Sequence, residues 1–241
     1  MIPRVQTWAQ THVGTVRRRN EDAYLCRPDL GLWAVADGAG GHQSGELASG
    51  MIIAALDRLE PGLTAAELLP RVRTAMAETH EALLHEAALR GAGAVIASTV
   101  VVLVLRDHHF ACLWAGDSRA YLLRRGELTQ LTRDHSLVQD LVDEGRLSAA
   151  AAEHHPQANV ITRALGADCI TLELDKVIGT IEPGDRFLLC SDGLSKTLPV
   201  SEIAGLLGAP DGVPPTELLV AAALARQGSD NVTAVVVTTA G

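Results

Sequence analysis

Residues 98–124 read STVVVLVLRDHHFACLWAGDSRAYLLR, and this stretch decides which kind of fold the chain adopts. It holds three runs of mainly apolar residues, at 98–106, 110–115 and 120–124, and each has the length and composition of a buried strand. A short polar turn separates the first two runs, so the sequence predicts an antiparallel hairpin there. The chain is therefore expected to build antiparallel sheet around this segment.

Outside this segment, further strands are interspersed with helices that come in groups. The apolar run 31–36 ends at Asp37 and is followed by the glycine-rich stretch 38–45. Other strands are predicted at 127–131, 170–178, 186–190 and 232–238, and helices at 46–59, 64–89, 136–152, 201–207 and 215–227. Regular β-α-β alternation is absent, which argues against a doubly wound parallel sheet. Because a run such as VVVLVL needs cover on both faces, we predict two adjacent antiparallel sheets covered by helices.

The composition is that of a globular protein without a nucleic-acid partner. Of the 241 residues, 47% are hydrophobic and 20% are charged, and the formal net charge is −9. A nucleic-acid partner would need a basic face. Residues 1–12 lack the apolar core of a signal peptide, and no apolar run is long enough to span a membrane. Four widely spaced cysteines are expected to be buried free thiols, which suits a reducing cytoplasm: Cys26, Cys112, Cys169 and Cys190.

Four aspartates stand at the ends of predicted strands, each beside glycine or a small polar residue. Asp37 and Asp192 close strands, Asp230 comes just before one, and Asp117 lies between two. A single Asp-Gly pair is usually only a turn. Four such residues at equivalent positions, however, predict carboxylates held at the rim of a sheet. Gathered carboxylates repel one another unless cations lie between them, and oxygen-only ligands suit Mg²⁺ or Mn²⁺ rather than zinc.

The N-terminal segment 14–22, GTVRRRNED, adds arginines just ahead of paired acids. If this segment is extended, Arg17, Arg19 and Glu21 share one face. A guanidinium is suited to grip a phosphate with two hydrogen bonds. By itself the segment could equally be a solvated run of charges.

These segments resemble the bacterial type 2C serine/threonine protein phosphatases, and the matches follow the order of that family along almost the whole chain. Each string is weak alone, but together they are highly specific. The matching strings are RRRNED (17–22), VADGAGGHQSGELAS (35–49), GDSRAY (116–121), LTRDHS (131–136), RALG (163–166), LLCSDGL (188–194) and SDNVT (229–233). The resemblance implies an α+β fold, a four-layer α-β-β-α sandwich with two central antiparallel sheets flanked by helices. It also implies a single, stand-alone catalytic domain over residues 1–241.

The resemblance assigns most of these residues to a metal centre. Asp37 would bridge two metal ions, and the carbonyl of Gly38 would bind the second. Asp192 and Asp230 would complete the shell of the first ion. Glu21 would bind the second ion directly or through water.

Three further roles follow from the same resemblance. Asp117, together with Asp192, would hold a third ion that bacterial members often carry. Arg17, in preference to its neighbours Arg18 and Arg19, would grip the substrate phosphate. Asp22 would orient a metal-bound water.

The implied activity is hydrolysis of phosphoserine and phosphothreonine in proteins by a metal-activated water, opposing a bacterial serine/threonine kinase. Two cations roughly 3.5–4 Å apart can share a water and lower its pKa, with no covalent phosphoenzyme. Arg17 and the ions would then neutralise the phosphoryl oxygens. Two or three Mn²⁺ or Mg²⁺ ions are expected. The protein is expected to be a cytoplasmic monomer that acts on phosphorylated proteins, a kinase and its substrates among them, away from any membrane.

The sequence departs from the family pattern at the proton donor. Eukaryotic relatives carry a histidine directly after the first Asp-Gly, where this chain has Ala39. His42 is a weaker candidate for the acid, and a metal-bound water could serve instead. Residues 137–160 match the mobile flap of the family. His154 and His155 in this segment have no acidic partner at useful spacing, so a metal role is not expected for them.

Two other functions remain open from the sequence. A catalytically dead relative could act as a binding module, but it would be marked by loss of metal aspartates, and Asp37, Asp192 and Asp230 are all present. A phosphatase for a small phosphorylated metabolite would carry the same residues. Substrate profiling is needed to separate that case from a protein phosphatase.

Overall fold

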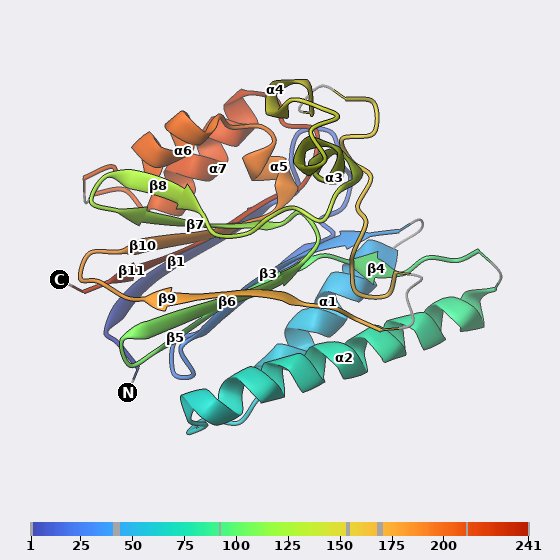
Figure 1. The fold of residues 1–241 in the computed structure, drawn as a ribbon, viewed down its shortest axis with the longest axis horizontal. Helices are drawn as coiled ribbons and strands as arrows, with labels where there is room; N and C mark the ends of the chain where they lie inside the picture. The colour runs from blue at the N-terminus through green and yellow to red at the C-terminus, as the bar shows by residue number, and fades with distance from the viewer. Residues whose placement is uncertain are drawn as a thin grey trace.

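A computed structural model describes residues 2–40, 44–91, 93–152, 155–167, 171–210 and 212–240. Two antiparallel sheets pack face to face in it, and helices cover the outer face of each sheet (Figure 1). The predicted α+β class and α-β-β-α layering are therefore confirmed. The candidate cysteine Cys169 and the histidines His42 and His154 lie outside the described residues.

The first sheet joins the two ends of the chain. Its strand order is β1-β11-β10-β7-β8, and the strands are β1 (Val5–His12), β11 (Val232–Thr239), β10 (Arg186–Cys190), β7 (Arg119–Arg124) and β8 (Glu127–Gln130). The last strand pairs with the first along its whole length, from Val5 opposite Thr239 to His12 opposite Val232. Residues from the two ends of the chain are therefore neighbours in this sheet.

The second sheet contains the hairpin that the sequence predicted. Its strand order is β2-β3-β5-β6-β9, with β4 paired to β3. The strands are β2 (Asp22–Arg27), β3 (Leu32–Ala39), β4 (Ala97–Ser98), β5 (Val100–Arg106), β6 (His109–Ala115) and β9 (Asp175–Thr180). Strands β5 and β6 pair from Val100 opposite Ala115 to Arg106 opposite His109, so the antiparallel hairpin is confirmed.

The helices form the two outer layers and one flanking segment. Helices α1 (Ser44–Asp57) and α2 (Ala65–Arg90) cover the second sheet, whereas α5 (Asp192–Ser195), α6 (Val200–Leu207) and α7 (Pro215–Ala225) lie against the first. The short helices α3 (Leu137–Asp143) and α4 (Ala149–Ala152) lie between β8 and β9 in the chain. In Figure 1 they lie beside α5, at one end of the sandwich. None of the helices among the described residues is long and apolar enough to cross a lipid bilayer.

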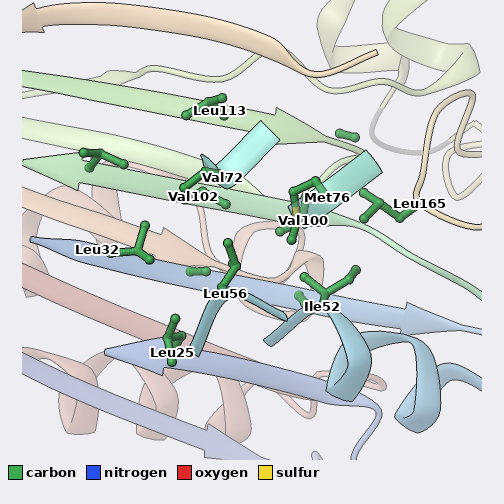
Figure 2. Packing of buried hydrophobic residues seen from close by; sticks show 14 of the residues in the cluster. Leu25, Leu32, Ile52, Leu56, Val72, Met76, Val100, Val102, Leu113 and Leu165 are labelled. Atoms are coloured by element: carbon green, nitrogen blue, oxygen red, sulfur yellow. The ribbon is translucent and has the colours of Figure 1, made fainter. Parts of the chain in front are cut away.

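The all-apolar strand β5 is explained by its two covered faces. Val101, Leu103 and Leu105 point into the core between the sheets, which includes Trp33 and Phe187. The alternate residues of β5 point the other way, into the core beneath α1 and α2. Figure 2 shows this second core, where Val100 and Val102 lie among Ile52, Leu56, Val72 and Met76. Because successive strand residues face opposite sides, a central layer reads as a continuous apolar run.

Several elements differ from the sequence prediction. Strands β1 and β2 were not predicted, since their residues are half exposed and mixed in polarity. The single helix predicted at 136–152 is two short helices, because Gly145 takes a positive φ of 69° that ends α3. The strand predicted at 170–178 is shifted to 175–180. Its pairing with β6 runs from Thr180 opposite His109 to Asp175 opposite Trp114, one residue before β6 ends.

Candidate metal centre

Carboxylates from both sheets meet at one end of the sandwich because of where the strands begin and end. In the second sheet, Asp22 begins β2 directly opposite Asp37 near the end of β3. In the first sheet, β10 runs into Asp192 and β11 starts just after Asp230, and these antiparallel strands pair there. Asp117 follows the end of β6. All of these carboxylates are close enough to raise the pKa of Asp37 by their charge.

Asp37 is fixed through its backbone. Its carbonyl oxygen accepts a hydrogen bond of 2.9 Å from the Thr99 peptide nitrogen and another of 2.9 Å from Ser98 Oγ. Its own peptide nitrogen donates to Thr99 Oγ1 at 3.2 Å. Burial raises the pKa of the Asp37 carboxyl well above its usual value, and Asp22 is the next largest cause. The backbone of Asp37 is therefore well fixed, and its carboxylate lies in a place that disfavours its charge.

Asp22 is buried and links the two sheets. Its Oδ2 accepts hydrogen bonds from Ser191 Oγ at 2.8 Å and Thr233 Oγ1 at 2.6 Å, both beside or in the first sheet. Its Oδ1 is buried without a hydrogen-bond partner among the described residues. Burial raises the pKa of Asp22 to about 7, although the two hydroxyl bonds counteract part of the rise. Such an orphaned oxygen in a polar site is a place for water or an ion.

Asp117 and Asp192 share one cation that the sequence analysis did not single out. Lys196 Nζ lies 2.7 Å from Asp117 Oδ2 and 2.8 Å from Asp192 Oδ2. Burial raises the pKa of Asp117 to about 6, the charge of Asp192 adds to the rise, and Lys196 opposes it. Asp117 Oδ1 is buried without a partner in the part of the chain that is described. The signal for Lys196 was its position four residues after Asp192 at the start of a helix, where side chains meet.

Arg17 and Asp230 form a more exposed ion pair at the same end. Arg17 Nη2 donates to Asp230 Oδ2 at 2.7 Å, and the side chains are 54% and 38% exposed. The hydrogen bond to Asp230 is the main reason why the pKa of Arg17 is raised. Exposed pairs of this kind are weak, so the guanidinium can exchange its partner for an incoming anion.

Tight backbone packing brings Glu21 and Gly38 together at the edge of the site. A methyl group on Gly38 would lie 2.0 Å from the Gly45 carbonyl oxygen, and one on Gly45 would lie 2.8 Å from the Glu21 carboxyl carbon. The Gly38 peptide nitrogen donates to the Glu21 carbonyl at 3.1 Å. Only glycine fits such a close approach of β3 to the start of α1. Glu21 and Gly38 therefore lie side by side, as the sequence analysis expected of residues that share an ion.

Asn231 is a second residue that the sequence analysis missed. Its Oδ1 accepts from the Glu21 peptide nitrogen at 2.8 Å, and its Nδ2 donates to the carbonyls of Val13 and Arg19, each at 2.8 Å. This side chain uses donor and acceptor to hold the arginine-rich segment against the start of β11. The signal was only its place beside Asp230.

The carboxylate and carbonyl oxygens at this end are the ligands that Mg²⁺ or Mn²⁺ prefers. Among the described residues, however, no three Asp, Glu, His or Cys side chains lie close enough together to bind an ion as they stand. Two of the chain's own cations, Lys196 and Arg17, instead take oxygens of Asp117, Asp192 and Asp230. Within the described part of the chain, two buried carboxylate oxygens still lack partners. Oxygen-only donors with unrelieved repulsion are what a hard divalent cation satisfies. An ion would draw these carboxylates together and would compete with Lys196 and Arg17.

The segment 137–160 borders this end of the molecule. Its two ends are tied by a hydrogen bond of 2.9 Å from the Leu137 peptide nitrogen to the Val160 carbonyl. Asn159 Oδ1 accepts from Lys196 Nζ at 3.0 Å, so the segment is linked to the carboxylate cluster through Lys196. His155 Nδ1 accepts from the Gln157 peptide nitrogen at 3.1 Å. Ala39 is exposed at the end of β3.

The chain is similar to known proteins over nearly its full length. The family model "Protein phosphatase 2C" matches residues 12–209. Serine/threonine protein phosphatase PstP of Mycobacterium tuberculosis is 37% identical over 95% of this chain, but the chain spans only 44% of that protein. Serine/threonine phosphatase stp of Listeria welshimeri is 32% identical over 95% of this chain and 93% of its own length.

Solved structures agree in fold. PppA, described as a key regulatory component of T6SS in Pseudomonas aeruginosa, is 42% identical and superposes with a TM-score of 0.91 over 99% of each chain. The catalytic domain of PstP, solved in complex with 2 manganese ions, is 34% identical with a TM-score of 0.83, covering 98% of this chain and 99% of that one.

Proposed function

The chain belongs to the protein phosphatase 2C family, and from this premise we propose that it hydrolyses phosphoserine and phosphothreonine residues in proteins with the help of divalent cations. One observation carries the proposal. Asp22, Asp37, Asp117, Asp192 and Asp230, which come from both sheets, meet at one end of the sandwich beside an exposed arginine. Such a cluster needs cations and provides a place for a phosphate.

We assign the ligands residue by residue. Asp37 would be the carboxylate shared by two ions, because the charges of Asp22, Asp117, Asp192 and Asp230 all act on it. Asp192 and Asp230 would complete the ligands of one ion, and Glu21 and the Gly38 carbonyl would bind the second. Asp117 and Asp192 would be the carboxylates available to a third ion. A relative solved with 2 manganese ions supports at least a pair of ions of this type.

The remaining residues bind and orient the substrate. When bound, the ions would lower the pKa of a water molecule between them and neutralise charge on the phosphoryl oxygens. Arg17, half exposed and paired with Asp230, would turn to the phosphate and bind it with two hydrogen bonds. Asp22, fixed through Oδ2, would accept a hydrogen bond from water at Oδ1.

No cysteine nucleophile is required for this reaction. Burial raises the pKa of the Cys190 thiol to about 12, and burial also raises the pKa of Cys26, to about 11. Both thiols therefore stay protonated near neutral pH and are poor nucleophiles. Direct attack by water agrees with this environment.

The substrates that we propose are phosphorylated proteins, including those of a bacterial serine/threonine kinase that the enzyme opposes. The enzyme would act in the cytoplasm as a monomer, with residues 1–241 forming one catalytic domain and about 137–160 forming its flap. PppA, at 42% identity, is described as a regulatory component of T6SS, so proteins of such a secretion system are the first substrates to examine.

The test is Mn²⁺-dependent release of phosphate from a phosphothreonine peptide. We expect activity with Mn²⁺, loss of activity in excess chelator, and loss in Asp192→Ala. Asp57→Ala is the matched control, because Asp57 lies at the end of α1 and contacts Arg27 on the surface. Persistent activity in chelator, or full activity of Asp192→Ala, would contradict the metal mechanism. Faster hydrolysis of small phosphorylated metabolites than of phosphopeptides would contradict the protein substrate.

A further inference from the structure

The ammonium group of Lys196 occupies the position between Asp117 and Asp192. It donates to Asp117 Oδ2 at 2.7 Å, to Asp192 Oδ2 at 2.8 Å and to Asn159 Oδ1 at 3.0 Å. An ammonium has three N–H donors, and here each finds one oxygen acceptor. These are the two carboxylates that would otherwise hold a third ion.

The local fold directs Lys196 to this position. Asp192 begins the short helix α5, and the Lys196 peptide nitrogen donates to the Asp192 carbonyl at 2.8 Å. One helical turn therefore places the lysine side chain over the aspartate. Asp117 arrives from the other sheet, where its side chain is only 1% exposed, whereas that of Lys196 is 31% exposed.

The ammonium group lies among three oxygen acceptors at 2.7, 2.8 and 3.0 Å, two of them carboxylate oxygens, which is the environment of a charged lysine. The ammonium also uses only one oxygen of Asp192, so the other oxygen is left for the ions of the main centre. A divalent ion in the same position would meet a fixed positive charge.

We propose that Lys196 is a built-in cation that takes the place of a third divalent ion, so that this chain works with two bound ions. The same side chain ties the segment around Asn159 to the metal centre. This inference rests on the proposed function, since it concerns the number of ions in the proposed centre. Lys196 is in this proposal a positioning residue, which does not itself react with the substrate.

The test counts bound Mn²⁺ by equilibrium dialysis, a measurement that does not depend on activity. The sequence has two lysines, so Lys196→Gln has Lys176→Gln, on an exposed position of β9, as its matched control. We expect two ions in the wild type and in Lys176→Gln. In Lys196→Gln we expect a third ion, bound at least about tenfold more tightly than any third ion of the wild type. Adding Asp117→Asn to Lys196→Gln should remove the third ion again.

The possible outcomes separate this inference from the proposed function. A wild type that binds no Mn²⁺ contradicts the metal centre itself. A wild type that binds three ions, or a folded Lys196→Gln that still binds two, contradicts only the role of Lys196. If Lys196→Gln does not give a native circular dichroism spectrum, the number of ions bound by the wild type still tests the proposal. Lys196→Arg, which keeps the positive charge, should then bind two ions.

Hydrogen exchange tests the tie to the flanking segment. Lys196→Gln and Asn159→Ala should both speed amide exchange at residues 137–152 and 155–160, whereas Lys176→Gln should not. Asn159→Ala should leave the ion count at two, because the ammonium still lies between the carboxylates. Unchanged exchange in both variants would contradict the tie.

Discussion

Strand β10 has a buried or half-buried aspartate just beyond each of its ends, and the two are treated in opposite ways. Asp185 precedes the strand with its side chain 1% exposed, and it is fully paired. Arg124 grips it through Nε at 2.8 Å and Nη2 at 2.7 Å, and the Glu182 peptide nitrogen donates at 2.8 Å. Asp192 follows the strand and has to share one ammonium with Asp117, one of whose oxygens has no partner among the described residues.

This contrast separates stability from function within one strand. At the Asp185 end, each negative charge has its own guanidinium, which is the arrangement that a buried carboxylate needs for stability. At the Asp192 end, several carboxylates are gathered with too few cations. Such an end contributes little stability by itself but has a high affinity for added positive charge. We therefore expect substitutions at the two ends to move stability and activity in different directions.

Asp37→Asn should give the largest effect at the Asp192 end. Removal of the charge that we propose to be shared by two ions should lower kcat/KM on a phosphothreonine peptide by about a thousandfold, comparable to the loss of a central group that stabilises the transition state. Without metal, the free energy of unfolding should stay the same or rise, because a repelled and buried charge has been removed. Steady-state kinetics and urea unfolding in chelator measure the two quantities. An Asp37→Asn variant that is strongly destabilised but keeps its activity would contradict the proposed contrast between the two ends of β10.

Asp185→Asn should give the opposite result at the other end. The free energy of unfolding should fall by about 3 kcal/mol, because Arg124 loses its buried partner. Below the unfolding transition, kcat/KM should remain within about twofold of the wild-type value, since Asp185 lies at the far end of β10. Urea unfolding of the variant checks the first statement and kinetics at low temperature the second. Loss of activity in a folded protein would break the contrast.

Arg17→Ala should have a smaller effect, confined to the substrate. Loss of a charged hydrogen-bonding group should cost about 2 kcal/mol in transition-state binding, or roughly thirtyfold in kcat/KM. Stability should hardly change, because its pair with Asp230 is exposed. Arg18→Ala is the control, since that residue is exposed and adjacent. Equal losses in the two variants would count against Arg17 as the phosphate ligand.

Gly184→Ala should give the smallest effect and tests only the backbone. Gly184 has a φ of +83°, but no atom lies within 4 Å of an added methyl group. The cost should therefore be about 1 kcal/mol of unfolding free energy, which is the strain of that conformation alone. At the other end of β10 a methyl on Gly193 would lie 1.9 Å from the Asn231 carbonyl oxygen. A thermal-denaturation loss at Gly193→Ala no larger than at Gly184→Ala would show that the site end is loosely packed.

Much of the fold could be predicted from local patterns. The runs in β5, β6, β7, β10 and β11 are apolar because sheets and helices cover them, so their sequences carry the signal. Strand β1 could not be found this way, because its half-exposed residues are in a strand only through pairing with β11 at the far end of the chain. The break in the 136–152 helix depended on one glycine in a positive-φ conformation.

In the candidate site, too, residues with a local sequence signal were predicted, and residues defined by long-range contacts were not. Asp37, Asp117, Asp192 and Asp230 could be found because each stands at a strand end, and the roles of these residues remain predictions. Lys196 has a near partner in Asp192, but its contact with Asp117 and the contacts of Asn231 were missed because those partners are distant in sequence. Lys196 reaches Asp117, 79 positions away, and Asn231 reaches the Glu21 peptide nitrogen, 210 positions away. Sequence spacing cannot reveal such contacts, since they depend on how the sheets are brought together.

The position of β11 between β1 and β10 has a consequence for the order of events during synthesis. Until residues 232–239 leave the ribosome, the first sheet lacks the strand that joins its two parts. The chain then holds Glu21, Asp37 and Asp192 but lacks the Thr233 hydroxyl that fixes Asp22. Contacts of such long sequence separation form late and slowly. A nascent chain in which β11 has not yet inserted therefore lacks part of the proposed metal centre, and we expect no phosphatase activity from it until this strand pairs with β1 and β10.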